Sequence, residues 1–263
     1  MPENRIHGAF APLTVSQNFL TSSHTIRRLL QKTDISPGDV VYEIGPGKGH
    51  ITRALLKTGA AVRAIELDPR LCARLRETCP ETARFSLKQG DFLKTPLPSK
   101  GSYKVFSNIP FSRTTEIVRK LTETPNPPAA AWLIVEYGAA KRFSTQPAAG
   151  DGTISMIARS LQPFFEIRIA DKIDRTEFHP APRVHAALLS IRRKESPDLP
   201  LSQRASYRKF LEIARARGLR NVLTKRQIST ALKLAGLPPV SADSNLLYVQ
   251  WLCLFRCWQK FGG

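Results

Sequence analysis

The fold is decided by residues 40–49, which read Val-Val-Tyr-Glu-Ile-Gly-Pro-Gly-Lys-Gly. The first five residues are mostly β-branched or aromatic, which predicts a buried strand. The glycines that follow predict a tight turn, and residues 51–57 predict a helix. A strand that runs through a glycine turn into a helix is typical of a sheet of parallel strands joined by helical crossovers.

The alternation of strand and helix continues towards the carboxyl terminus. Parallel strands need crossover connections, so the pattern predicts a Rossmann-like α/β sheet with helices on both faces. Two late strands lie close together in the sequence and predict an antiparallel hairpin at one edge. Strands are expected at residues 61–65, 85–88, 103–106, 130–136, 164–169 and 184–191, and helices from 22 or 23 onward, at 70–78, at 115–122, from 137 and near 154–161.

The character of the chain changes after Lys194, where a short run containing two prolines reads as a linker. The rest of the sequence predicts helices alone, with breaks at Gly218 and at the Gly-Leu-Pro-Pro run. We therefore expect a Rossmann-like domain at 1–195, which begins with a flexible basic arm at 1–15, and a small all-helical domain at 196–263. The helices of the second domain are expected at residues 203–217, 225–235 and 246–259.

The net charge predicts a polyanionic partner. The chain carries 40 Lys and Arg against 21 Asp and Glu, a formal net charge of +19. A basic surface attracts phosphates and releases their counterions, so nucleic acid is the first candidate and an anionic membrane the second. Residues 196–263 are the denser in positive charge, and the alternative for them is an ordinary solvated helix face. The candidates for contacting phosphates are Arg215, Arg217, Arg220, Lys225 and Arg226.

The four cysteines, at positions 72, 79, 253 and 257, have no spacing that predicts a zinc site. Reduced thiols fit a cytoplasmic protein. No segment has the length and hydropathy of a membrane span or a secretion signal. We therefore expect a cytoplasmic protein with neither a metal nor a membrane partner.

The glycine turn itself suggests a class of ligand. Its spacing is G-x-G-x-G, and Glu43 stands two residues before Gly45. Dinucleotide-binding turns usually read G-x-G-x-x-G and place a pyrophosphate at the helix N-terminus. A carboxylate at this place disfavours a pyrophosphate and suits a cationic ligand such as a sulfonium amino acid. The alternative is a glycine turn used only for packing.

Acidic residues close the next two predicted strands. Glu66 could accept hydrogen bonds from both hydroxyls of a ribose, a role that serves several nucleotide cofactors alike. Asp91 could accept from an adenine amino group, with Phe92 against the ring, although a Gly-Asp pair is as often a turn. Asp68 is expected to cap the helix that begins after Pro69.

The run Asn108-Ile109-Pro110-Phe111 closes the fourth strand of the pattern. An adenine amine is a poor nucleophile because its lone pair is delocalised into the ring. If the Asn108 side-chain oxygen and the Ile109 carbonyl accept its hydrogens, the nitrogen becomes pyramidal and its lone pair is freed. Pro110 fixes φ and holds that carbonyl in place, and Phe111 can stack on the base. The alternative is an Asn-x-Pro turn with a core Phe.

Taken together, these motifs resemble one family. Residues 16–20 (SQNFL), 43–49, Glu66, Gly90-Asp91, 108–111 and 178–184 (FHPAPRV) occur in the order found in the rRNA adenine N6-methyltransferases. Within that family the chain resembles the Erm antibiotic-resistance enzymes. Ile109 and the short basic helical tail favour this branch over the KsgA-type 16S rRNA dimethyltransferases, which usually have Leu at the position of Ile109.

The resemblance implies a cofactor and a substrate. The cofactor is S-adenosylmethionine, and the substrate is a specific adenine of 23S rRNA that is flipped out of a structured segment. Its methylation at N6 by a monomeric enzyme gives macrolide–lincosamide–streptogramin B resistance. Phe111 replaces the Tyr of many relatives, and residues 144–152 are less clearly helical than in Erm enzymes.

The resemblance also implies residue roles. Asn18 and Leu20 would contact the methionine part of the cofactor beside Gly45, Gly47 and Asn108. Glu66 would hold the ribose, and Asp91 with Phe92 the adenine. The target amine would be bound by Asn108 and Ile109, supported by Pro110, with Phe111 stacked on the base and residues 178–184, including Phe178 and Arg183, shaping the pocket for the target base.

Three alternatives stay open at this point. One is a KsgA-type 16S rRNA adenine dimethyltransferase, against which Ile109 and the compact tail count. Another is a nucleic-acid-binding relative that has lost the chemistry, which needs neither Asn108 nor the glycine turn. DNA adenine methylation is a third, and it is disfavoured because such enzymes usually have Pro where Ile109 stands.

Overall fold

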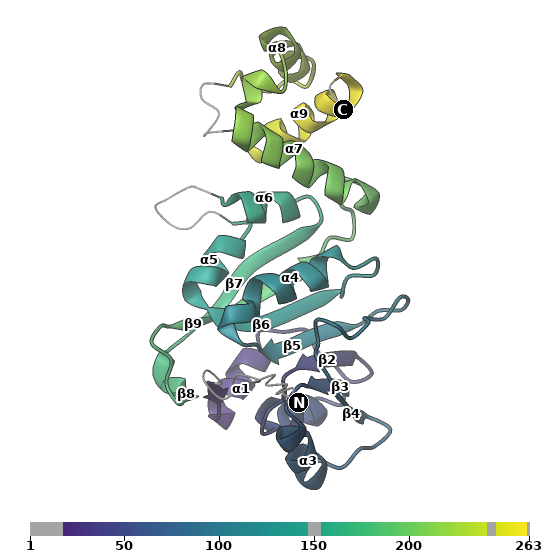
Figure 1. The fold of residues 1–263 in the computed structure, drawn as a ribbon, viewed down its shortest axis with the longest axis vertical. Helices are drawn as coiled ribbons and strands as arrows, with labels where there is room; N and C mark the ends of the chain where they lie inside the picture. The colour runs from purple at the N-terminus through teal and green to yellow at the C-terminus, as the bar shows by residue number, and fades with distance from the viewer. Residues whose placement is uncertain (1–17, 147–153, 241–245, 262–263) are drawn as a thin grey trace, which may run out of the picture. The chain divides into compact units, whose positions relative to one another are not determined.

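The computed structural model of the chain describes residues 18–146, 154–240 and 246–261 (Figure 1). The arm expected at residues 1–15 lies outside them. The chain forms two compact units. The first contains the described residues up to Ala140 together with Ile169–Ser190, and the second contains Lys141–Arg168 and the described residues from Ile191 onward.

A largely parallel sheet is the centre of the fold, which confirms the predicted Rossmann-like α/β class. Its seven strands lie in the order β4-β3-β2-β5-β6-β9-β7, and the four strand pairs from β4 to β6 are parallel. The strand formed by residues 40–44 is β2, in the middle of these pairs. The strands are β2 (Val40–Ile44), β3 (Ala61–Glu66), β4 (Phe85–Gln89), β5 (Lys104–Asn108), β6 (Ala130–Glu136), β7 (Phe165–Ile173) and β9 (Ala186–Arg193).

The strand order changes direction at β2. The chain runs from β2 through β3 to β4 on one side and from β5 to β6 on the other. Crossovers between parallel strands are right-handed, so α2 and α3 cover one face of the sheet and α4 covers the opposite face. Ligands of such sheets bind beyond the strand ends at this switch point. The helices are α2 (His50–Lys57), α3 (Pro69–Thr78) and α4 (Thr114–Glu123).

A side chain joins β2 to β5 at the switch point. The ladder between the two strands pairs Val41 with Lys104 and Tyr42 with Val105. Beyond it, the buried hydroxyl of Ser107 accepts a hydrogen bond from the backbone N–H of Ile44. This hydroxyl therefore satisfies a backbone donor that the ladder leaves over, one residue before Asn108.

Helix starts follow the capping residues of the sequence. Helix α1 (Ser23–Leu30) begins after Ser22, whose hydroxyl accepts from the Thr25 N–H at 3.2 Å. Helix α3 begins after Asp68, whose carboxylate accepts from the Arg70 N–H at 2.8 Å. Both starts match the sequence prediction, because a side-chain acceptor there replaces the missing backbone acceptor.

A second, two-stranded sheet links segments that are distant in the sequence. Strand β1 (Phe19–Leu20) pairs antiparallel with β8 (Phe178–His179). Phe19 lies opposite His179, and Leu20 lies opposite Phe178. The segment before α1 is thereby held against the segment that follows β7.

The C-terminal region that follows β9 is helical, as expected, and has an aromatic core. Phe210 of α7 packs against Trp251, Phe255 and Trp258 of α9 at ring-centroid distances of 6.0, 5.8 and 5.6 Å. In the described parts of the chain, no helix is both long and apolar enough to cross a membrane. The helices of the second unit are α6 (Met156–Leu161), α7 (Arg204–Arg217), α8 (Lys225–Leu234) and α9 (Tyr248–Phe261), and α5 (Tyr137–Phe143) lies where the two units join in sequence.

Two features differ from the sequence predictions: the connection between the last two strands and the extent of the second unit. Strands β7 and β9 are neighbours at the sheet edge, but the segment between them is longer than a hairpin turn and contains β8 and a 3₁₀ helix at Arg175–Glu177. The second unit also takes in residues 141–168, because α6 packs on α7. The domain boundary after residue 195 stays a prediction.

Replacing Ser107 by Ala should destabilise the protein by about 1–3 kcal/mol, because the buried Ile44 N–H then loses its acceptor. Urea unfolding followed by circular dichroism measures the change. Ser112→Ala is the matched control, since Ser112 is exposed, and it should leave the unfolding free energy within about 0.5 kcal/mol. Equal stability of the two variants would contradict the role given to Ser107.

Candidate active site

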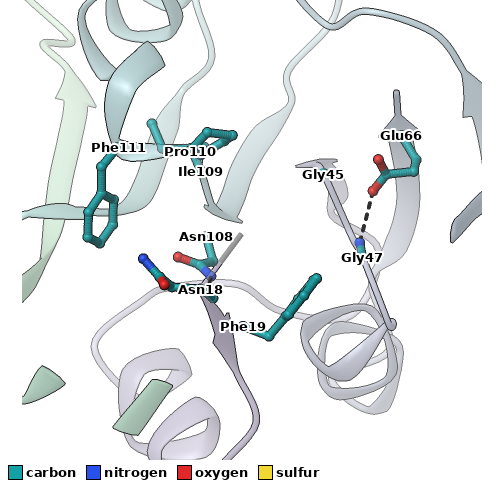
Figure 2. Close-up of a pocket in the computed structure, with 9 residues that line it drawn as sticks. All are labelled: Asn18, Phe19, Gly45, Gly47, Glu66, Asn108, Ile109, Pro110 and Phe111. Carbon is teal, nitrogen blue, oxygen red and sulfur yellow. Dashed lines mark hydrogen bonds between the residues drawn. The ribbon is translucent and has the colours of Figure 1, made fainter. Parts of the chain in front are cut away.

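A pocket opens at the switch point of the sheet, and its lining comes from four strand ends. Segments that follow β2, β3 and β5, together with the beginning of β1, contribute residues (Figure 2). The parallel strands bring these ends to one edge, which is why residues distant in the sequence meet there. The pocket is lined by Asn18, Phe19, Gly45, Gly47, Glu66, Asn108, Ile109, Pro110 and Phe111.

The glycine turn approaches its neighbours too closely for a side chain. Gly47 has a φ of +56°, in the left-handed region that favours glycine. A Cβ atom on Gly47 would lie 2.6 Å from Cε1 of Phe19. The turn therefore needs glycine here both for its backbone conformation and for its packing against Phe19.

Glu66 connects the end of β3 to the glycine turn. Its carboxylate is buried, and Oε2 accepts a hydrogen bond from the Gly47 N–H at 3.0 Å (Figure 2). The other oxygen accepts from the Asp68 N–H at 3.0 Å. Each carboxylate oxygen has a second lone pair, so Glu66 keeps acceptor capacity towards the pocket that it lines.

Glu43 differs from the expectation that its negative charge faces the ligand. It is 1 % exposed, is absent from the pocket lining, and accepts a hydrogen bond from the Thr52 hydroxyl at 2.6 Å. Burial raises the pKa of Glu43 to about 8, and the charge of Glu66 adds to the increase against the opposing Thr52 hydrogen bond. Glu43 is therefore mostly protonated at pH 7, and Glu66 is the acid at the pocket.

The orientation of the Asn108 amide follows from its partner. Nδ2 of Asn108 donates to the backbone carbonyl of Asn18 at 2.7 Å. A carbonyl can only accept, so the amide nitrogen must face Asn18 and the amide oxygen must face elsewhere. Figure 2 shows the side-chain oxygen of Asn108 on the side towards Phe111 and its nitrogen on the other side. The side-chain oxygen is thereby left available as an acceptor.

The residues after Asn108 are held by the core and by proline. The Ile109 side chain is buried, so this residue can offer its backbone rather than its side chain to a ligand. Pro110 has φ −59° and ψ 122°, and a 3₁₀ helix (Phe111–Arg113) begins after it. The structure is therefore compatible with the expectation that Pro110 holds the Ile109 carbonyl in place.

Phe111 and Phe178 form an aromatic pair. Their ring centroids are 6.4 Å apart and their planes are inclined by 79°, an edge-to-face contact. Phe111 is half-buried, whereas Phe178 is 3 % exposed. Phe178 thus packs against Phe111, and the RNA contact that we expected of it stays a prediction. Arg183 is exposed.

Three other expected cofactor residues lie outside the pocket lining. The Leu20 side chain is buried in the core, and the preceding Phe19 lines the pocket instead, because neighbouring residues of a strand face opposite sides. Asp91 accepts from the Leu93 N–H at 2.8 Å, which closes a turn. Phe92 is buried, with Nζ of Lys120 at 5.2 Å from its ring centroid.

Sequence reasoning missed Lys120 as well as Phe19. The Lys120 ammonium donates to the carbonyls of Leu93 and Thr95, at 2.8 and 2.6 Å. Burial lowers its pKa, and the charge of Asp91 works in the opposite direction. Lys120 therefore connects α4 to the turn that contains Asp91 and Phe92. Nothing in the local sequence marks it, whereas alternation along β1 could have pointed to Phe19.

The candidate phosphate contacts are brought together only in part. All five are exposed: Arg215 and Arg217 lie in the last turn of α7, Arg220 in the 3₁₀ helix Leu219–Asn221, and Lys225 and Arg226 in the first turn of α8. All five charges are therefore accessible, as a contact with RNA phosphates requires. Within the described ranges, no group of three or more His, Cys, Asp or Glu could hold a metal ion.

The buried carboxyl of Glu43 makes a prediction about pH. A folded-state pKa of about 8 against an ordinary value of 4.5 means that this group favours the fold fully below pH 4.5 and progressively loses that contribution as the pH rises through 8. Between pH 5 and pH 9 the wild type should therefore lose stability relative to Glu43→Gln, which has no proton to lose.

Chemical unfolding at several pH values measures this difference. Glu77→Gln, on the exposed side of α3, is the control and should follow the wild-type pH profile. Parallel profiles for the wild type and Glu43→Gln would mean that Glu43 is charged in the folded protein.

Comparisons with known proteins agree with the geometry. The profile of the family described as "Ribosomal RNA adenine dimethylase" matches residues 13–255. The chain is 35 % identical over 246 residues to an rRNA adenine N-6-methyltransferase of Limosilactobacillus reuteri, which covers 94 % of this chain and 96 % of the relative. It is 35 % identical over 185 residues to the ribosomal RNA small subunit methyltransferase A of Prosthecochloris aestuarii, which covers 70 % and 69 %.

A solved structure shows the same fold over nearly the whole chain. The crystal structure of the 23S rRNA methyltransferase ErmE has a TM-score of 0.77 and 26 % identity, and the match covers 92 % of this chain and all of that one. In this chain the glycine turn, Glu66 and the oriented Asn108 line one pocket at the switch point of the sheet. The chain belongs to the ribosomal RNA adenine dimethylase family and is an S-adenosylmethionine-dependent rRNA adenine N6-methyltransferase.

Proposed function

We propose that this enzyme methylates N6 of one adenine in 23S rRNA and thereby confers macrolide–lincosamide–streptogramin B resistance, acting as a monomer in the cytoplasm. The observation that carries the proposal is the extent of similarity. Relatives called rRNA adenine N-6-methyltransferase match 94 % of the chain, the C-terminal helices included, and the chain matches the whole of the ErmE structure.

The pocket contains the groups needed to hold the cofactor. S-adenosylmethionine, when bound, supplies an electrophilic methyl group on a sulfonium. We assign the methionine part to Asn18 and the turn at Gly45 and Gly47, and the ribose to Glu66, which lines the pocket with acceptor capacity to spare. We keep Asp91 and Phe92 as the adenine contacts, held by Lys120 through the backbone of their turn.

The target amine is oriented by two acceptors. The Asn108 side-chain oxygen is turned away from Asn18, and the Ile109 carbonyl follows it in the chain. Acceptance of both amine hydrogens by these oxygens directs the nitrogen lone pair to the methyl group. The reaction then depends on positioning, and the product amine loses its proton without a dedicated base.

The base itself must leave its stack to reach this pocket. Phe111 offers a ring that is half-buried and supported edge-on by Phe178, so the ring is held in one orientation for stacking. Arg183 lies in the segment that follows β8, and its exposure supports a contact with the RNA backbone. The basic residues of the second unit supply further phosphate contacts.

A second candidate is methylation of adenine in 16S rRNA. The match to a ribosomal RNA small subunit methyltransferase A at 35 % identity favours it, although that match covers only 70 % of this chain. The two candidates differ in the RNA and not in the chemistry of the pocket.

Incubation with labelled S-adenosylmethionine and either protein-free 23S or protein-free 16S rRNA separates the candidates. Label should appear in 23S rRNA, at one adenine that primer extension or mass mapping locates. Label in 16S rRNA alone would overturn the proposal, and label in neither would favour a binding protein. Resistance of a susceptible host that expresses the gene tests the biological role.

Asn108→Asp tests the orientation of the amide. An Asp carboxylate keeps the oxygen acceptor but has no N–H for the Asn18 carbonyl, so the two oxygens repel each other and the side chain turns away. We expect kcat/KM for rRNA methylation to fall by about 100-fold or more, with RNA retention unchanged.

Asn126→Asp is the matched control. Asn126 also donates its amide N–H groups to backbone carbonyls, those of Pro98 and Gly101, but it does not line the pocket. Its variant should keep kcat/KM within about twofold of wild type. A fully active Asn108→Asp enzyme would contradict our proposal that the hydrogen bond to the Asn18 carbonyl orients the Asn108 side chain for catalysis.

A further inference from the structure

The C-terminal unit has a cavity of its own. It has a volume of about 440 Å³ and lies between the 3₁₀ helix Leu219–Asn221, α8 and the segment that follows α8. Cavities of this size accommodate small organic ligands. None of its lining residues lines the active-site pocket. They are Leu219, Arg220, Lys225, Ile228, Ser229, Leu232, Lys233, Leu237, Pro239 and Val240.

The inner wall of this cavity is apolar. Leu219 and Leu232 are almost completely buried, and Ile228 and Leu237 are half-buried beside them. Pro239 contributes a further apolar ring to the lining. A planar, largely apolar group would therefore lose its hydration on entering, which favours its burial.

The outer residues are cationic, and no acidic residue is among those that line the cavity. Arg220, Lys225 and Lys233 are all exposed, and no ion pair of any of the three occurs among the described residues. Glu212 is the single acid between residues 199 and 240, and it pairs with Arg208 at 4.0 Å. Among the residues that the structure describes, the charged side chains that line the cavity are thus all positive, and they complement a phosphate chain.

The N-terminus of α8 is capped, so the positive charge at the cavity comes from side chains and not from free helix N–H groups. Thr224 and Gln227 form a capping box, in which the Thr224 hydroxyl accepts from the Gln227 N–H at 3.2 Å and Gln227 Oε1 accepts from the Thr224 N–H at 2.8 Å. The first-turn donors are therefore partly satisfied within the helix. An anion at this end of α8 would therefore contact the Lys225 side chain and not free backbone N–H groups.

We propose that this cavity binds an unpaired nucleotide of the RNA substrate, with the base against the apolar wall and its flanking phosphates against Arg220, Lys225 and Lys233. The proposal rests on the proposed function for the identity of that RNA. A paired base has both faces covered by its neighbours, so only an unstacked base can enter an apolar cavity. The Ser229 hydroxyl is the polar group in the lining that can reach a base edge.

This nucleotide is a second one, distinct from the methylated adenine, because the two pockets share no residue. It gives the basic unit a way to recognise RNA structure. Phosphate contacts alone are insensitive to sequence and shape, whereas a cavity for one base requires a bulge or loop at a set place.

The test uses the full-length protein and two RNA hairpins of equal length and charge. One carries a single unpaired 2-aminopurine, and in the other the same nucleotide is paired. Wild type should bind the bulged hairpin about tenfold more tightly, and the probe fluorescence should change on binding. Equal affinity for the two hairpins would overturn the proposal.

Variants then locate the effect. Ser229→Phe places a ring in the cavity and keeps every cation, and it should remove the preference for the bulge without weakening binding to the paired hairpin. Lys233→Gln should weaken binding to the bulged hairpin. Lys209→Gln removes the same charge from an exposed site outside the cavity, and it should affect both hairpins equally. A Ser229→Phe protein that keeps the preference would contradict the proposal.

Two controls distinguish a failure of this proposal from a failure of the proposed function. Binding is measured without S-adenosylmethionine, so it does not depend on methyl transfer. A bulge preference that Ser229→Phe removes, without methylation of 23S rRNA, would leave this proposal intact and defeat the proposed function. Displacement of the bulged hairpin by an acidic peptide with greater potency than by paired RNA would assign the cavity to a protein partner and overturn the proposal.

Discussion

The hydrogen bond from the Asn108 amide to the carbonyl of Asn18 is the constraint on which the site depends. An amide presents two ends of similar size and opposite hydrogen-bonding character, and a partner that can only accept selects one of them. The selection needs the end of β5 and the segment before α1 to lie in contact. The β1–β8 pairing and the packing of Phe19 on Gly47 keep that segment in place.

Two buried acids near the pocket, Glu43 and Glu66, differ in their hydrogen-bond partners. Glu43 and Glu66 lie at adjacent strand ends, and both are buried. Glu66 accepts two backbone N–H groups, whereas Glu43 has a hydroxyl partner and a pKa raised to about 8 by burial. Only Glu66 lines the pocket, and the raised pKa of Glu43 keeps that buried carboxyl mostly uncharged at neutral pH, which avoids an unpaired buried charge.

The two units use charge in opposite ways. In the first, hydrogen bonds of the buried residues Glu66 and Ser107 and of the part-buried Asn108 place single atoms. In the second, arginines and lysines stay exposed around an apolar cavity, where their contribution to phosphate binding depends on the salt concentration. Methyl transfer needs the first arrangement, and the capture of a large polyanion is served by the second.

The elements and their order could be predicted from local patterns, because hydrophobic period, glycine turns and caps such as Ser22 and Asp68 act within a few residues. The same patterns place Gly45, Glu66 and Asn108 at strand ends, and parallel strands bring such ends together. Four features depend instead on tertiary packing: Phe19 and not Leu20 lines the pocket, Phe178 packs against Phe111, Lys120 donates to the turn after β4, and the pKa of Glu43 is raised. Each of these depends on a neighbour far along the chain or on the degree of burial, and a local pattern contains neither.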